Sequence, residues 1–160
     1  MRTRFLVLAF ATLLAASARA ETVRFGDQPA FVVTVPDGWT QDGPRGGFAV
    51  WSPDYKLGIT MTVLPTDGSL DHMADMSMAR GGVPGVTHRV GPAALGPYRG
   101  FAYDSETIGK NGIHGYFRFV LVTIDDKRTA AAGLVSFYPP SDPGFAGGLE
   151  VLKTLSLDPK

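Results

Sequence analysis

The chain has 160 residues, with 15 basic and 15 acidic side chains, no cysteine and a hydrophobic fraction of 44%. This length fits one domain, and so large an apolar fraction at zero net charge argues against an extended disordered chain. There is no basic surplus to attract nucleic acid, and the missing cysteine excludes disulfides, thiolate nucleophiles and cysteine-ligated metal sites.

The first twenty residues have the order of a secretory signal peptide. Arg2 and Arg4 precede the apolar run 5–16, and small residues occupy the −3 and −1 positions before Glu21. The run is too short to span a bilayer core of about 30 Å. We therefore expect cleavage after Ala20 and export to the bacterial periplasm, with no integral membrane segment left. An uncleaved N-terminal anchor is the alternative.

Cleavage would also change the charge of the chain. The segment 1–20 carries three arginines and no acidic residue, so the remaining 140 residues would have a net charge of −3. The sequence predicts one domain over 21–160, because proline and glycine are spread through turns and no linker or repeat interrupts the chain.

Most of this domain has the pattern of β-strands. Residues 57–63 alternate apolar side chains with Gly and Thr, as expected of a strand covered on one face. Asn111-Gly112 between two β-rich runs indicates a hairpin. The run 117–122 is apolar on both faces and predicts a central strand. The predicted strands are 31–35, 47–51, 57–63, 98–108, 113–124 and 129–138.

Two helices are predicted. The first starts after Ser69 as N-cap and ends at Gly81-Gly82. The second has Asp142 as N-cap and Pro143 at its first position. Gly147-Gly148 weakens this second helix, so it must depend on packing. Its apolar stripe is predicted to contain Phe145, Leu149, Leu152 and Ser156.

Runs of strands with one helix in the middle and one at the end favour an α+β sandwich. The segment 31–39, with the sequence FVVTVPDGW, resembles the opening of the PsbP-like superfamily. The order that follows is also similar: a strand ending at Pro65, a helix, a three-strand meander and a closing segment 145–157. The resemblance covers nearly all of the mature chain.

This resemblance implies a three-layer sandwich, in which an antiparallel sheet of about six or seven strands has helices on both faces. Members include thylakoid-lumen extrinsic proteins of photosystem II, a nuclear Ran-binding protein and bacterial periplasmic proteins. The resemblance therefore implies that this protein is a binding or assembly factor and not an enzyme. Trp39 is the one family-marking residue, with core packing as its implied role.

The first predicted helix contains a candidate metal site. His72 and Met76 are four residues apart and Met73 and Met76 three apart, so all three converge on one helix face. Imidazole and thioether ligands suit Cu(I). Met78 lies about 160° around the helix from Met76 and is excluded from this site. The alternative is that the methionines are core residues. The buried stripe would then consist of Leu70, Met73, Ala74 and Ser77.

The predicted hairpin contains a candidate polar binding face. His114, Tyr116 and Arg118 share one face of their strand, and Tyr103 and Ser105 share one face of the partner strand. Either hairpin register expected here pairs residues of opposite parity and so places both sets on the same face of the sheet. Such a face offers Arg118 as a donor to an anionic or polar ligand. The alternative is a solvated face with Arg118 stacked on Tyr103.

Three aromatic residues lie in or near turns rich in proline and glycine: Trp51, Tyr55 and Tyr98. Aromatic side chains on loops often anchor a protein partner. The alternative is that they cover the ends of the core.

The main hypothesis is an exported, non-enzymatic binding or assembly module without a cofactor. Its partner would be a periplasmic protein or an envelope component, contacted through loops 40–56 and 109–113 or the Tyr116/Arg118 face. The alternative is a periplasmic copper-binding protein. A small hydrolase is a third and disfavoured hypothesis, because Ser136 lies within a strand and has no nucleophile elbow.

Overall fold

The computed structural model describes residues 20–43, 47–80, 87–109 and 111–159. The predicted signal peptide up to residue 19 and the predicted helix end at Gly81-Gly82 lie outside these residues. The described elements are β1 (Ala20–Phe25), β2 (Ala30–Pro36), β3 (Thr40–Asp42), β4 (Phe48–Trp51), β5 (Leu57–Pro65), α1 (Leu70–Arg80), β6 (His88–Leu95), β7 (Tyr98–Ile108), β8 (His114–Thr123), β9 (Arg128–Ser136), α2 (Pro143–Lys153) and β10 (Ser156–Asp158).

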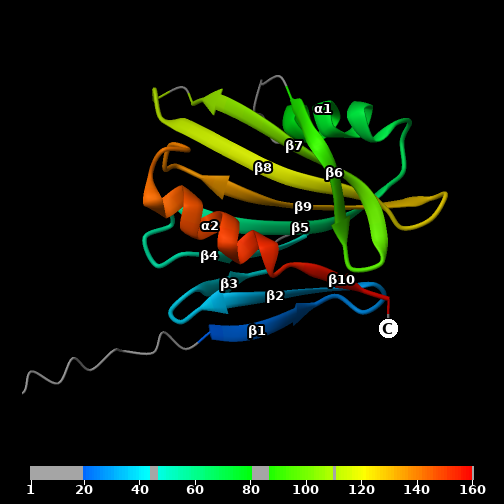
Figure 1. Ribbon diagram of the computed structural model, residues 1–160, viewed down its shortest axis with the longest axis horizontal. Coiled ribbons are helices and arrows are strands. Elements are labelled where there is room, and N and C mark those ends of the chain that lie inside the picture. The colour runs from blue at the N-terminus through cyan, green and yellow to red at the C-terminus, as the bar shows by residue number, and fades with distance from the viewer. Residues whose placement is uncertain (1–19, 44–46, 81–86, 110, 160) are drawn as a thin grey trace, which may run out of the picture.

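The strands form two antiparallel sheets (Figure 1). The larger sheet has seven strands in the order β3-β4-β5-β9-β8-β7-β6, and the smaller has the order β1-β2-β10. The α+β class and the seven-stranded antiparallel sheet are therefore confirmed. All six predicted strands are present, as β2, β4, β5, β7, β8 and β9.

The smaller sheet was not predicted, because two of its three strands carry weak signals. β1 begins at the expected cleavage site, and β10 is only three residues long. The placement of Ser156 on the stripe of the last helix was wrong. Helix α2 ends at Lys153 with Thr154 as its C-cap, and Ser156 instead pairs with Val32 of β2.

Strand β6 was also missed, because it contains glycine and proline. It lies at the edge of the larger sheet, where the missing N–H of Pro92 is tolerated. The register shifts between Arg89 and Gly91, which marks a bulge in this edge strand.

Both predicted helix starts are confirmed. The Ser69 hydroxyl accepts a hydrogen bond from the amide of His72 at 3.2 Å. The Asp142 carboxylate accepts one from the amide of Gly144 at 2.6 Å, with Pro143 at the first position. No helix of the described ranges is long and apolar enough to cross a membrane.

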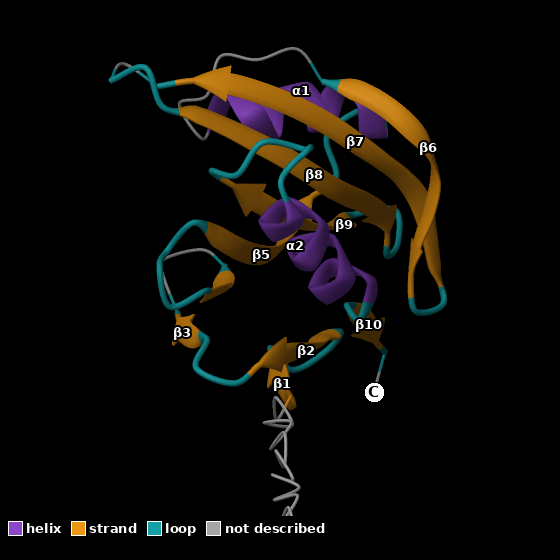
Figure 2. Ribbon diagram, turned by 60° about the vertical axis from the view of Figure 1, so that its left-hand side comes forward, coloured by secondary structure: helices purple, strands orange, loops and turns teal. Residues whose placement is uncertain are grey.

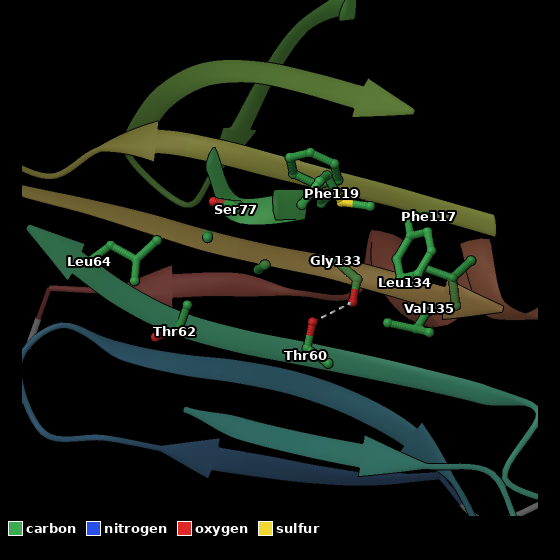
Figure 3. A pocket seen from close by; sticks show the side chains of 12 residues that line it. Thr60, Thr62, Leu64, Ser77, Phe117, Phe119, Gly133, Leu134 and Val135 are labelled. Atoms are coloured by element: carbon green, nitrogen blue, oxygen red, sulfur yellow. Dashed lines mark hydrogen bonds between the residues drawn. The ribbon is translucent and has the colours of Figure 1, made fainter. Parts of the chain in front are cut away.

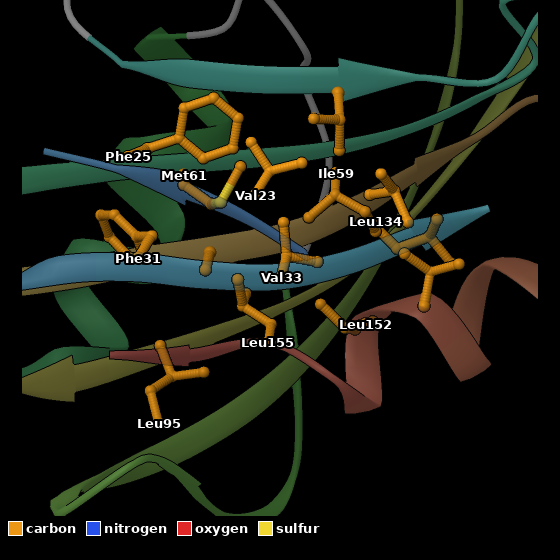
Figure 4. Close-up of a cluster of buried hydrophobic side chains, with 14 of the residues drawn as sticks. Val23, Phe25, Phe31, Val33, Ile59, Met61, Leu95, Leu134, Leu152 and Leu155 are labelled. Atoms are coloured by element: carbon orange, nitrogen blue, oxygen red, sulfur yellow. The ribbon is translucent and has the colours of Figure 1, made fainter. Parts of the chain in front are cut away.

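Two hydrophobic clusters hold the elements together. The larger cluster joins both sheets and α2, which packs against β2, β5 and β9 (Figures 2 and 4). The smaller cluster joins α1 to β7 and β8. Adjacent residues of β9 alternate between them, since Ala132 and Leu134 belong to the larger cluster and Ala131 packs against the smaller. Trp39 packs against the larger cluster.

The two glycines of α2 make a matched test of how this helix packs. An added Cβ at Gly147 would have no neighbour within 4 Å, whereas one at Gly148 would lie 2.8 Å from Leu134 Cδ1 and 3.2 Å from Leu57 Cδ2. We expect Gly147→Ala to raise the free energy of unfolding by about 0.5–1 kcal/mol. The free energy of unfolding of Gly148→Ala should be lower than that of Gly147→Ala by about 1 kcal/mol or more, because Leu134 and Leu57 must shift to make room for the added Cβ. Urea denaturation checks both, and equal stabilisation would contradict the close helix–sheet packing.

Candidate functional site

Three loops lie at the same end of the larger sheet, on the left in Figure 1. The strand registers align Leu57 of β5, Ser136 of β9, Tyr116 of β8 and Glu106 of β7 in one row. The turn 52–56 and the loops 109–113 and 137–142 lie just beyond this row. Three strand spacings separate the outer members of the row, or about 14 Å.

Large apolar side chains are exposed at this end. Tyr55 is 62% exposed, Ile108 61%, Ile113 52% and Phe137 45%. We call these four residues the end patch. They are four of the six large apolar side chains that are exposed among the described residues. Contiguous exposed apolar surface marks interaction sites, and these four side chains lie at the same end of the sheet.

Tyr55 also has an unfavourable backbone conformation. Its φ is 57°, in the left-handed region, and it is the one non-glycine residue with positive φ among those described. A side chain with a Cβ pays roughly 1–2 kcal/mol for this conformation. Glycine would avoid that cost, and 62% exposure leaves the tyrosine ring little burial to offset it. Folding stability alone does not explain a tyrosine here.

A hydrogen-bond network fixes the loop that carries Tyr55. Ser52 Oγ donates to Asp54 Oδ1 at 2.6 Å, Tyr138 Oη donates to Oδ2 at 2.6 Å, and the Lys56 amide donates to Oδ1 at 3.1 Å. These hydrogen bonds, with that from Ser52 the strongest cause, lower the pKa of Asp54 to about 2. The network joins the β4–β5 turn to the segment that precedes α2.

The hairpin at the same end has a register that differs from the prediction. Ile108 pairs with His114, so the loop has five residues, closed by a hydrogen bond of 2.8 Å from the Gly109 amide to the Ile113 carbonyl. Gly112 has the positive φ, 76°, that this turn requires. The expected pairing of residues of opposite parity was therefore wrong, and a one-residue slip moves every side chain of a strand to the other face.

Consequently, the predicted polar face is divided. His114, Tyr116 and Arg118 lie opposite Ile108, Glu106 and Asp104 of β7. Tyr103 and Ser105 lie on the other face of the sheet and are buried. The structure thus keeps the β8 half of the predicted face together and replaces its β7 half with two carboxylates.

The two carboxylates pair with the hydrogen-bond donors of the β8 face. Arg118 donates from Nε to Asp104 Oδ1 at 2.7 Å and from Nη2 to Oδ2 at 2.6 Å, as a bidentate pair. His114 Nδ1 lies 2.8 Å from Glu106 Oε1. Arg118 is accordingly paired within the protein, and the predicted anion-binding role has lost its principal donor.

Tyr103 instead anchors α1. Its hydroxyl donates to Asp71 Oδ1 at 2.8 Å, and its ring stacks on Phe119 with centroids 5.5 Å apart. Burial, aided by the Asp71 carboxylate, raises the pKa of Tyr103 to about 12. Arg89 also binds Asp71 and covers the ring of Phe101 at 3.9 Å, not that of Tyr103. The predicted stacking of Arg118 on Tyr103 does not occur.

The three loop aromatics have different surroundings. Tyr98 is half-buried and packs against the larger cluster. Trp51 is half-buried and its ring covers Gly58, where an added Cβ would collide with it. Tyr55 is the exposed member of the three, so it alone keeps the geometry of a partner anchor.

The predicted copper ligands line one small depression of about 10 Å³. His72 is exposed, Met76 is half-buried and Met73 is 5% exposed. Met73 and Ala74 are buried as the core alternative predicted, and Met78 is buried with them, whereas Leu70 and Ser77 are half-buried. Within the described ranges, no group of three or more His, Asp and Glu side chains could hold a metal.

Comparison with known proteins identifies the fold. No protein-family model and no curated protein matches the chain. The Ran-binding protein Mog1p of Saccharomyces cerevisiae is similar over 88% of this chain and 96% of its own, with a TM-score of 0.57 and 10% identity. At that identity the likeness shows a shared fold and not a shared function.

Two bacterial structures are also similar. A protein of Bacteroides thetaiotaomicron VPI-5482 has a TM-score of 0.47 and 12% identity, over 79% of this chain and 44% of its own. PA94 of Pseudomonas aeruginosa, a protein of unknown function, has a TM-score of 0.42 and 13% identity, over 84% of this chain and 94% of its own.

The Asp54 network predicts a pH dependence of stability. The pKa of Asp54 in the folded protein, about 2, lies below the ordinary value of 3.8. The Asp54 carboxylate therefore stabilises the fold fully above pH 3.8, and this stabilisation is lost as the pH falls from 3.8 through 2. Asp54→Asn should therefore reduce the loss of stability over that range, measured as urea midpoints against pH. Asp126→Asn, in the β8–β9 turn at the other end of these strands, is the control. An unchanged pH profile in Asp54→Asn would contradict the network.

Proposed function

We propose that the protein is an exported, non-enzymatic binding or assembly module of the bacterial periplasm. Its partner is a protein or an envelope component that covers the end patch. The observation that carries this proposal is Tyr55, which is held at a positive φ and is 62% exposed. Strained residues cluster at binding and switch sites, where the surrounding structure enforces them.

The composition of the end patch also supports a partner. Tyrosine is enriched among the residues that dominate binding energy, and apolar neighbours exclude water around it. The row of registers brings Ile108, Ile113 and Phe137 to the same end of the sheet as Tyr55. Arg118 and Tyr116 lie on strand β8 close to this end and belong to the rim of the proposed interface.

Export and family membership are parts of the same proposal. Expected cleavage after Ala20 removes a single residue of β1 and leaves its pairing with β2 from Glu21 onward. We assign the chain to the PsbP-like superfamily and propose that α1 and α2 form the outer layers of a three-layer sandwich. Mog1p, which has a similar fold, is a Ran-binding protein and so gives a precedent for protein binding on this fold.

Tyr55→Gly separates stability from binding. We expect it to raise the free energy of unfolding by about 1 kcal/mol, because glycine adopts positive φ without strain. For the binding test, a photoreactive residue replaces Ile113 and crosslinks the partner in the periplasm. Tyr55→Gly should lower the yield of this crosslink at least fivefold. A photoreactive residue at Val90, 54% exposed on the edge strand β6, is the control position.

Three results would contradict the binding proposal. They are an undiminished crosslink in Tyr55→Gly, recovery of the same partner from position Val90, and an enzymatic turnover that His114→Ala abolishes. Arg118→Ala should weaken the crosslink less than Tyr55→Gly does, because Arg118 is already paired with Asp104.

Cu(I) binding is the second candidate function, favoured by one observation. His72, Met73 and Met76 line the same depression beside Leu64 and Pro65. If they bind copper, Cu(I) in excess should raise the melting temperature of the purified protein, and His72→Ala with Met76→Leu should remove the shift. An unchanged melting temperature of the wild type in excess Cu(I) would exclude this function.

A further inference from the structure

An open trough of about 280 Å³ lies beside α1 on the larger sheet (Figure 3). Its floor is a sheet surface of small residues. Thr60 of β5, Gly133 of β9 and Phe119 of β8 form one row, and Thr62 and Ala131 continue the floor in the next. Position 133 requires glycine, because an added Cβ would lie 2.4 Å from the Cβ of Phe119.

Larger apolar side chains enclose this floor. Phe119 of β8 lies at one side, and Phe117 and Val135 lie at one end. Met78 of α1 also lines the trough. Helix α1 packs chiefly against β7 and β8, and Leu64 of β5 and Ala131 of β9 pack against the same cluster. The trough is therefore the uncovered part of a sheet face whose other part forms the core beneath α1.

The chemistry of the lining specifies the occupant. None of the twelve lining residues is charged. The hydroxyl of Ser77 donates to the Met73 carbonyl at 2.7 Å, and that of Thr60 to the Gly133 carbonyl at 3.5 Å. Thr62 lies on the floor of the trough and also has an interaction within the protein. A charged occupant would lose its hydration here without gaining an ionic partner among the lining residues.

We propose that this trough binds a small neutral hydrocarbon ligand of about two fused rings. Its volume is close to twice that of a cavity of about 150 Å³ that binds benzene. A peptide would bring more backbone amides and carbonyls than the three hydroxyls of the lining can pair. A second copy of the chain would need roughly 20–30 contact residues a side, more than the twelve that line the trough. The site uses residues other than the end patch and so goes beyond the proposed partner binding.

The test uses 1-fluoronaphthalene as a neutral probe and 4-fluoronaphthalene-1-sulfonate as its charged counterpart, both followed by ¹⁹F NMR line broadening. The neutral probe should bind the full chain saturably, and the sulfonate at least tenfold more weakly, because none of the described lining residues is a cation. Equal affinity for the two probes, or no saturable binding of the neutral one, would overturn the proposal.

Variants then locate the binding. Ala131→Leu fills the floor and should raise the Kd of the neutral probe at least tenfold, whereas Ala146→Leu, on the exposed face of α2, should leave it unchanged. Val135→Lys places a charge at the end of the trough and is the second variant if Ala131→Leu does not fold, as judged by thermal melting. Unchanged binding in a folded variant would overturn the proposal.

Two further outcomes separate the possible occupants. A dimer in sedimentation velocity that Ala131→Leu dissociates would assign the trough to a second copy and overturn ligand binding. Tyr55→Gly should leave the probe affinity unchanged, since Tyr55 is not part of the lining. Failure of the end-patch proposal and failure of the trough proposal are therefore distinguishable.

Discussion

The pairing of β8 with β7 on one side and β9 on the other is the constraint on which the remaining structure depends. Side chains of these strands alternate strictly between two faces, so the five-residue hairpin loop decides which residues meet α1 and which meet the opposite surface. Tyr103 and Phe119 thereby enter the cluster beneath α1, while Arg118 pairs with Asp104. A loop one residue shorter would place Tyr103 and Arg118 on the same face of the sheet.

The same alternation produces the two surfaces proposed to bind. On the α1 face, β9 contributes only Ala131, Gly133 and Val135, which are too small to fill the space beside the helix. On the other face, α2 packs so closely on Leu134 that a Cβ added at Gly148 would lie 2.8 Å from Leu134 Cδ1. One strand of small residues therefore allows dense packing against one helix and leaves a trough beside the other.

The end patch and the trough differ in what holds them in place. The Asp54 network fixes the β4–β5 turn, and its hydrogen bonds support a tyrosine backbone conformation that costs free energy. The trough rests on packed strands and on α1, which Asp71 ties to Tyr103 and Arg89. The first surface presents large exposed side chains to a partner, and the second offers an uncharged recess.

Local sequence determined both helices and six of the ten described strands, because caps, turns and residue periodicity act over a few residues. Ser69 and Asp142 start the two helices, and six strands follow from β-rich runs and alternation. Tertiary structure alone decided the rest. Strand β10 exists because β2 offers it an edge, and the hairpin register depends on a turn closed by Gly109 and Ile113. Tyr55 was a sequence candidate, whereas Ile108 and Phe137 join it only because distant strands align. The charge and volume of a residue are local, but its neighbours across a sheet are set by pairing over the whole chain.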